Sequence, residues 1–367
     1  MKSAFDNAIN LIFIGTLSAV GVASFLMPQN AINEFESRQR APLPRLSLDD
    51  PQSLNMRNLK AFPFEFEYFF NDRIALRERT IMLRNLLKLK LWNVSGAKNV
   101  VIGERQYLFF EDDINQGLPD KVVAYTQPQL KEVTEKFLAP YRELKRRGTK
   151  YLLVVVPGKS AACSTFLKAD LAQNWNRVRM NQVLKVLSAE GMPVLDLTEH
   201  LAGNGSENPN YFKRDTHWNW HGALVASKTI EERLSKEFPA MNVIRSAKIQ
   251  ETPVLHKTAD LARMLAVGSI ITERSRDIRL QLEDKKPIME KSGNHSIVKF
   301  ANRSNPALPE AILFCDSFGQ YLLRYLQHSF SDLTSCEEPY VNCEIVEKLK
   351  PKVVIHEVAD RFFAYPK

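Results

Sequence analysis

The short stretch from residue 211 to residue 223 holds the side chains best suited to catalysis. Asp215 and His217 are separated by one residue, so on an extended loop both side chains point to the same side. A carboxylate in this position orients an imidazole and leaves the second ring nitrogen free to act as a base. The stretch therefore predicts the base half of a nucleophilic active site.

A candidate nucleophile lies further along the chain. Residues 311–315 form an apolar run that predicts a buried strand, and residues 320–328 predict a helix. Ser317 lies in the turn between them. A serine at such a turn exposes its hydroxyl and holds its backbone N–H near a helix N-terminus, where a developing oxyanion is stabilised. We therefore expect a triad of Ser317 as nucleophile, His217 as general base and Asp215 as the orienting carboxylate.

Each of these residues also has a purely structural interpretation. Ser317 and Asp215 could cap the helices that follow them, and His217 could be a partly buried histidine with satisfied hydrogen bonds. A metal site is a further alternative, because Asp215, His217 and His221 could supply three ligands and leave a position open. No fourth ligand is placed nearby. We expect neither a metal nor a cofactor.

Helix-like and strand-like patterns alternate through the rest of the chain. Residues 64–92 predict a helix, and a hairpin follows at 100–102 and 106–110. Further helices are predicted at 128–147, 174–189 and 223–238, and strands at 151–156, 194–197, 311–315 and 352–358. Residues 245–305 interrupt this alternation with a charged, weakly patterned insert. The alternation predicts a doubly wound parallel sheet covered on both faces, with Ser317 at a strand's carboxyl end, where such sheets bind ligands.

The N-terminal segment differs in character from the body. Residues 9–27 are almost entirely apolar, which is long enough to cross a bilayer as a helix. A cleaved signal peptide is the alternative. We expect a transmembrane anchor over residues 1–28, a polar linker over 29–58 and one domain over 59–367, with the body outside the cytoplasm.

Composition excludes some classes of function. The net charge of +8 favours anionic surfaces or polymers. The sequence has no basic cluster interleaved with aromatic residues and no glycine-rich phosphate loop, so we expect no nucleic-acid partner.

None of the four cysteines forms a Cys-x-x-Cys pair. Free thiols are slightly favoured, with a disulfide between Cys336 and Cys343 as the alternative.

Two motifs together resemble the alginate O-acetyltransferase family. They are Asp215-Thr216-His217-Trp218 followed by Gly222-Ala223, and Phe314-Cys315-Asp316-Ser317-Phe318-Gly319. Further similar pieces are residues 69–73, 101–109, 154–159 and 353–361, so the resemblance covers roughly residues 60–365. The order Asp, His, Ser is that family's order, reversed from ordinary SGNH hydrolases.

The resemblance implies a fold and a function. The fold would be SGNH-hydrolase-like in permuted motif order, preceded by one transmembrane helix. The function would be O-acetylation of an alginate-like exopolysaccharide in the periplasm, through an acetyl-serine intermediate and with anchoring in the inner membrane. A multi-spanning membrane acyltransferase would donate the acetyl group. Lys159 would lie in the family's Pro-x-Lys position and could bind an anion, or be a surface residue.

Two alternatives to this function stay open. An acetylesterase would use the same triad with water as acceptor. A non-catalytic subunit would bind glycan or act as a scaffold in a polysaccharide secretion complex, with Trp218 and Trp220 either lining a cleft or packing in the core.

Overall fold

The computed structural model describes most of the chain. The described residues are 7, 9–16, 18–19, 22, 32–33, 38–44, 55–74, 77–115, 118, 123–172, 177–203, 210–257, 259–282, 287–291, 297–302 and 305–364. The chain divides into two compact units, one of Met1–Ala97 with Ala262–Ile270 and one of Lys98–Leu261 with Ile271–Lys367. The second unit contains all three triad candidates. The predicted boundaries at residues 28 and 58 stay a prediction.

A seven-stranded sheet forms the centre of the larger unit. Its strand order is β6 (Val194–Asp196), β5 (Lys150–Val156), β13 (Val353–Ala359), β11 (Glu310–Phe314), β12 (Asp332–Cys336), β10 (Ile297–Ala301) and β9 (Ile288–Lys291). The first five strands are parallel, and β10 pairs antiparallel with both β12 and β9. Strand β13 is buried along its whole length and β5 at every residue but its first. This burial explains their continuous apolar, β-branched sequences.

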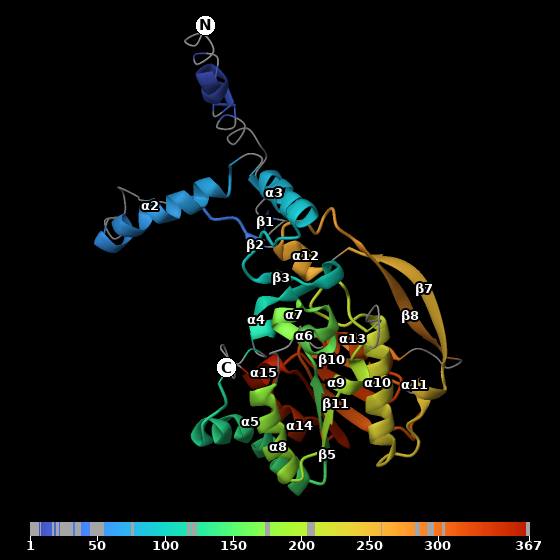
Figure 1. The fold of residues 1–367 in the computed structure, drawn as a ribbon. Coiled ribbons are helices and arrows are strands. Elements are labelled where there is room, and N and C mark those ends of the chain that lie inside the picture. Colours follow the sequence, from blue (N-terminus) through green and yellow to red (C-terminus); the bar gives the residue numbers. More distant parts are fainter. Residues whose placement is uncertain are drawn as a thin grey trace. The chain divides into compact units, whose positions relative to one another are not determined.

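Alternate residues of the strands enter two separate cores. Leu152 and Val154 of β5 face a core with helices α10 (Trp220–Ser235) and α13 (Gly319–Leu326). Leu153 and Val155 face a second core with α5 (Gln127–Arg146) and α8 (Val178–Ala189). Figure 1 shows α5 and α8 on one side of the sheet and α10 on the other. The two-sided covering predicted from the sequence is confirmed.

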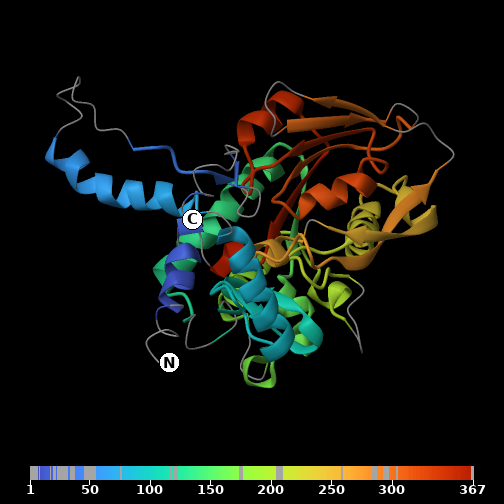
Figure 2. The same ribbon diagram turned by 90° about the horizontal axis from the view of Figure 1, so that it is seen from above.

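The sheet is mixed, so the predicted parallel sheet is confirmed for five of its strands and wrong for the antiparallel pairing of β10. Strands β10 and β9 come from residues 245–305, the segment in which the sequence showed no clear pattern. The same segment supplies a separate antiparallel ribbon of β7 (Lys248–His256) and β8 (Glu273–Gln281), which stands apart from the sheet in Figure 2. Most of β7 is exposed. A strand that is exposed on both faces needs no apolar alternation, which explains the weak sequence signal of β7.

Short elements complete the larger unit. The predicted hairpin is confirmed as β3 (Val100–Ile102) and β4 (Leu108–Phe110). The others are η2 (Glu104–Gln106), α4 (Glu111–Asn115), α6 (Lys159–Ala162), η3 (Ser164–Phe166), α7 (Ala169–Ala172), α9 (Thr198–Leu201), α11 (Val243–Ser246), α12 (Asp260–Met264), α14 (Cys343–Leu349) and α15 (Arg361–Ala364). All four cysteines are free thiols, and three of them are buried.

The single helix predicted for residues 64–92 is divided into two helices in the smaller unit. They are α2 (Met56–Asn71) and α3 (Arg77–Trp92), in addition to the short strands β1 (Ile32–Asn33) and β2 (Arg38–Gln39). Helix α2 ends at Asp72, whose carboxylate accepts from the Ala41 amide at 2.8 Å. Among the described residues, no helix is long and apolar enough to span a membrane. Much of the predicted anchor, residues 1–28, lies outside the described residues.

The turn that carries Ser317 is tied to the neighbouring central strand. The Asp316 carboxylate accepts from the Phe318 amide at 2.8 Å and from the Ala359 amide, at the end of β13, at 3.0 Å. Gly319 follows, and a Cβ there would lie 2.2 Å from the Cβ of Cys315 and 2.9 Å from Glu357 Oε2. Glycine is therefore required for helix α13 to begin this close to the strands.

We predict that Gly319→Ala destabilises the protein by about 1–3 kcal/mol, because the added methyl group overpacks the buried turn. Urea unfolding checks this, with the exposed Ser188→Ala in α8 as the control. Equal unfolding free energies for both variants would show that the turn relaxes without cost.

Candidate active site

A tight loop presents His217. Tyr211 and Trp218 form an antiparallel bridge, and the Asn219 amide donates to the Asn210 carbonyl at 2.9 Å. Asn219 also caps α10 by accepting from the amides of His221 and Gly222. The alternative in which Asp215 caps this helix is therefore wrong, and its carboxylate is available for other contacts.

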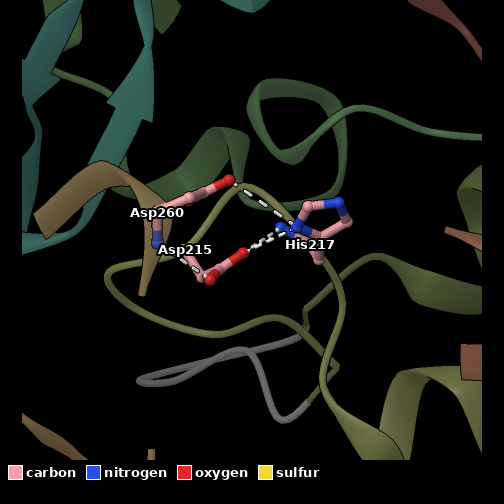
Figure 3. A group of neighbouring side chains, drawn as sticks. All are labelled: Asp215, His217 and Asp260. Carbon is pink, nitrogen blue, oxygen red and sulfur yellow. Dashed lines mark hydrogen bonds and ion pairs between the residues drawn. The ribbon is translucent and has the colours of Figure 1, made fainter. Parts of the chain in front are cut away.

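The structure brings Asp215 and His217 together as predicted. Oδ1 of Asp215 lies 2.7 Å from Nδ1 of His217 and accepts from the His217 amide at 3.0 Å. Figure 3 shows the carboxylate aimed at the ring. The paired Nδ1 leaves Nε2 as the nitrogen that can exchange a proton with a third group.

Ser317 is that third group. Its hydroxyl oxygen lies 2.9 Å from Nε2 of His217. Helix α13 begins after Phe318, and no side chain caps it, so the interpretation of Ser317 as a helix cap was wrong. The three candidates thus form one hydrogen-bonded chain from carboxylate to imidazole to hydroxyl. This geometry can activate a serine as a nucleophile.

Two further residues that the sequence analysis missed hold Asp215. Its second oxygen, Oδ2, accepts from the Asp260 amide at 3.0 Å and lies 3.3 Å from Nε2 of His256. The ring of His256 stacks on Phe212 with centroids 3.9 Å apart. Both residues come from the weakly patterned insert. A histidine and an aspartate four positions apart gave no signal, because nothing in their spacing relates them to residue 215.

Asp260 also places a second carboxylate beside the base. Its Oδ2 lies 3.6 Å from Nδ1 of His217, as Figure 3 shows. Its Oδ1 accepts from the Thr216 amide at 2.8 Å, and the Thr216 hydroxyl donates to the other oxygen. His217 is therefore flanked by two carboxylates, one in direct contact and one slightly further away.

These contacts shift the pKa values of the site. Burial raises the pKa of the Asp215 carboxyl, but the hydrogen bonds from His217 and His256 outweigh burial and hold it well below its usual range. Burial lowers the pKa of His217, whereas the hydrogen bond and charge of Asp215 and the charge of Asp260 raise it to a net value above the usual one. Burial and the charge of Asp215 raise the pKa of Asp260.

The potential metal ligands are already engaged in hydrogen bonds. Asp215, His217 and Asp260 have ligand atoms within 4.8 Å of one another, but those atoms contact each other and Thr216. The set considered from the sequence, with His221 in place of Asp260, is not assembled. Nδ1 of His221 lies 2.8 Å from Oδ1 of Asn210. The arrangement fits a hydrogen-bonded triad better than a metal centre.

Lys159 is not a surface residue. It is 1 % exposed, and its ammonium group donates to the carbonyls of Lys213 and Asp215 at 2.9 Å each. Burial lowers its pKa. Lys159 therefore supports the backbone of the loop that carries Asp215 and has no free access to a ligand.

The two tryptophans of the motif have different environments. Trp218 is fully buried and packs edge-on against Phe318. Trp220 is half-buried and stacks with the guanidinium of Arg324, 3.4 Å from its ring centroid. Core packing thus holds for Trp218. Trp220 lines a cavity of about 440 Å³ together with Phe212 and His256.

A larger cleft of about 580 Å³ borders the triad loop on its Lys213–Arg214 side. It is rich in positive charge, with two acidic side chains, Glu251 and Glu273. The basic residues that line it are Arg105, Lys213, Arg214, Arg274 and Arg276. Arg276 pairs with Glu251 at 2.6 Å, and Glu273 accepts from the amides of Lys213 and Arg214. The cleft therefore keeps a net positive charge.

Comparison with known proteins finds a family model that matches this chain. Residues 100–292 match the model of the family described as "SGNH hydrolase-like domain, acetyltransferase AlgX". The matched segment is more than half of the chain. It contains Asp215 and His217 and ends before Ser317.

Curated relatives and a solved structure agree with this match. The "Probable alginate O-acetylase AlgJ" of Pseudomonas aeruginosa is 24 % identical over 216 residues, 57 % of this chain and 51 % of the relative. Its namesake in Pseudomonas putida is 22 % identical over 151 residues, 41 % and 37 % of the two chains. The match thus spans about half or less of these relatives. PatB1 of Bacillus cereus shares the fold, with a TM-score of 0.53 and 15 % identity over 73 % of this chain and 98 % of PatB1.

We predict that Asp215→Asn and Asp260→Asn both lower the pKa of His217, and that Asp215→Asn lowers it more. Each change removes a negative charge that favours the protonated ring, and Asp215 makes the direct hydrogen bond. Titration of the His217 ring protons by NMR checks this, with His221 as the internal control. An unchanged His217 pKa in Asp260→Asn would mean that solvent screens the second carboxylate.

Proposed function

The chain belongs to the family of SGNH hydrolase-like domains of acetyltransferase AlgX, and we propose on this basis that it is a polysaccharide O-acetyltransferase. The acetyl group passes through an ester on Ser317, His217 is the general base and Asp215 orients it. The observation that carries the proposal is the hydrogen-bonded chain with its contacts of 2.7 and 2.9 Å. A glycan-binding module or scaffold would have no need of that chain.

In the first half-reaction, the Ser317 hydroxyl oxygen attacks the carbonyl carbon of an acetyl donor, and its proton moves to Nε2 of His217. The positive ring is stabilised by Asp215, in direct contact, and by Asp260 at 3.6 Å. The tetrahedral intermediate then expels the donor's leaving group, which takes the proton from His217. The product is acetyl-Ser317.

In the second half-reaction, a sugar hydroxyl attacks the acetyl carbon of acetyl-Ser317. His217 removes the hydroxyl proton and returns it to the Ser317 oxygen as the ester bond breaks. The Ser317 backbone N–H donates to no acceptor in the part of the chain that the structure describes, and it would donate to the oxyanion in both half-reactions.

The acceptor that the charge distribution favours is an anionic polymer of the alginate type. The cleft beside the triad loop carries five cationic side chains and two acidic ones. Lys213 and Arg214 immediately precede Asp215, so a carboxylate-bearing chain held there would lie close to the loop. The relatives named as alginate O-acetylases are consistent with this acceptor.

The proposed setting follows from the N-terminal sequence and the family. The apolar residues 9–27 would anchor the chain in the inner membrane, with the larger unit in the periplasm. The acetyl donor would then be a multi-spanning membrane acyltransferase that delivers acetyl groups from the cytoplasmic side.

We predict that Ser317→Ala and His217→Ala each reduce acetate release from a chromogenic acetyl ester on the order of a thousandfold or more, because either change removes a member of the triad. The full chain in detergent is the sample, and Arg142→Ala on the exposed face of α5 is the control. Mass spectrometry should find an acetyl adduct on Ser317 in the wild type.

Added oligosaccharides then separate the transferase from the esterase. A mass gain of one acetyl group on an alginate-type oligosaccharide supports the transferase. Acetate release without any sugar product supports the acetylesterase. No acetate release and no adduct on Ser317 would favour the non-catalytic scaffold.

We predict that kcat/KM for the ester rises with pH through the pKa of His217, at a value above the usual ~6.5 of histidine. The ring must be neutral to accept the serine proton, and its two carboxylate neighbours favour the charged form. In Asp260→Asn the midpoint should move to lower pH. A midpoint that differs from the His217 pKa measured by NMR would assign the profile to another group.

A further inference from the structure

Helix α3 carries an apolar stripe on its exposed side. Leu83, Leu87 and Leu91 are each four residues apart, so they lie in one row along the helix. Their exposed fractions are 55 %, 42 % and 65 %. Single exposed leucines are common, but a row of three along one helix is an apolar surface that is normally covered.

The opposite side of α3 is already used within its own unit. Asn85 and Leu89 are buried, and the Asn85 amide group donates to the Leu265 carbonyl at 2.9 Å. The helix therefore has one face that packs inward and one that does not, and the stripe belongs to the second face.

Positive charge borders the stripe on both sides. At about 100° per residue, Arg79 and Lys90 fall on one side of the leucine row, and Arg84 and Lys88 fall on the other. The helix has one acidic residue, Glu78, which pairs with Arg40 at 3.0 Å. Within the described part of the chain, Arg79, Lys88 and Lys90 have no acidic side chain within ion-pair distance.

We propose that α3 lies in the surface of an anionic lipid bilayer, with the leucine stripe in the acyl region and its cations among the headgroups. An apolar stripe flanked by lysine and arginine is typical of helices that lie in a membrane interface. Long basic side chains reach the headgroups while their methylene stems cover apolar surface.

Charge complementarity favours lipid over a protein partner. Positive side chains lie along both edges of the stripe with no acidic side chain between them. This arrangement suits a continuous layer of negative headgroups. Helix α2 in the same unit also exposes aromatic residues, such as Phe64 and Tyr68. Its two basic and two acidic residues cancel in charge, so this helix has no electrostatic preference for anionic lipids. The apolar residues 9–27 precede both helices in the chain, so an anchor there would hold α3 near the bilayer. The inference does not depend on the triad.

A tryptophan introduced by Leu87→Trp, at the centre of the stripe, reports directly on the proposed contact. The full chain is mixed with, or reconstituted into, vesicles whose lipids carry brominated acyl chains, either pure phosphatidylcholine or with about one third phosphatidylglycerol. The contribution of position 87 is the difference in tryptophan quenching between the Leu87→Trp variant and wild type. We expect it in the vesicles with phosphatidylglycerol and expect it to be weaker in pure phosphatidylcholine.

Two double variants separate the charge from the apolar stripe. Lys88→Glu with Lys90→Glu should abolish the dependence on phosphatidylglycerol, because each cation near an anionic surface strengthens binding about fivefold. In the Leu87→Trp background, Leu83→Gln with Leu91→Gln should abolish the quenching from position 87 in both lipids. The matched control is Lys131→Glu with Lys185→Glu, which makes the same change in charge on α5 and α8 and should have no effect. All substituted positions are exposed or half-buried, so the variants should fold, which thermal unfolding checks.

Three results would overturn the proposal. The first is quenching from position 87 that is absent in both lipids. The second is quenching that does not change in the Lys88 and Lys90 variant. The third is an indole at position 87 that is already shielded from acrylamide without any lipid, which would assign the stripe to a second copy, another protein or another segment of this chain.

Discussion

A single buried carboxylate, Asp215, determines how the candidate site is built. It is 4 % exposed, and an ionised carboxylate so far from water requires donors for its lone pairs. It has four: the amide and ring of His217, the amide of Asp260 and the ring of His256. These contacts fix the loop that carries the base and join it to a segment more than 40 residues later in the chain. The orientation of His217 is a consequence of satisfying this charge.

The sheet supplies the other half of the arrangement. Parallel strands place their carboxyl ends at one edge, and Ser317 follows β11 there. Asp316 ties this turn to the end of β13, and the buried Glu357 of β13 accepts from the Asp316 amide at 3.3 Å. Burial raises the pKa of Glu357 well above its usual range. The nucleophile is thus held by backbone contacts to the central strands.

The two compact units have different surface chemistry. In the larger unit, cationic residues gather in a cleft beside the triad loop, where an anionic chain could be held near the nucleophile. In the smaller unit, cations border an exposed leucine stripe on α3. The net charge of +8 is therefore distributed over at least two surfaces, which suit two kinds of anionic partner, a polymer and a lipid surface.

The sequence alone determined the elements and the types of side chain in the site. The patterns of residues 151–156 and 311–315 predicted buried strands, because a strand covered on both faces must be apolar throughout. The local motif around residue 215 predicted the pairing of carboxylate and imidazole, since residues two apart on an extended loop face the same way. The turn at residue 317 indicated an exposed hydroxyl.

Only the tertiary structure decided which distant groups meet. The 2.9 Å contact of His217 with Ser317 depends on how α10 and α13 pack on the same face of the sheet. His256 and Asp260 reach Asp215 from an exposed ribbon and a short helix, whose sequences carry no periodic signal. Lys159 can be buried because its ammonium group donates hydrogen bonds to two backbone carbonyls. These bonds offset the loss of hydration, and no local sequence pattern predicts them. Long-range contacts of this kind arise from packing, and packing is a property of the whole chain.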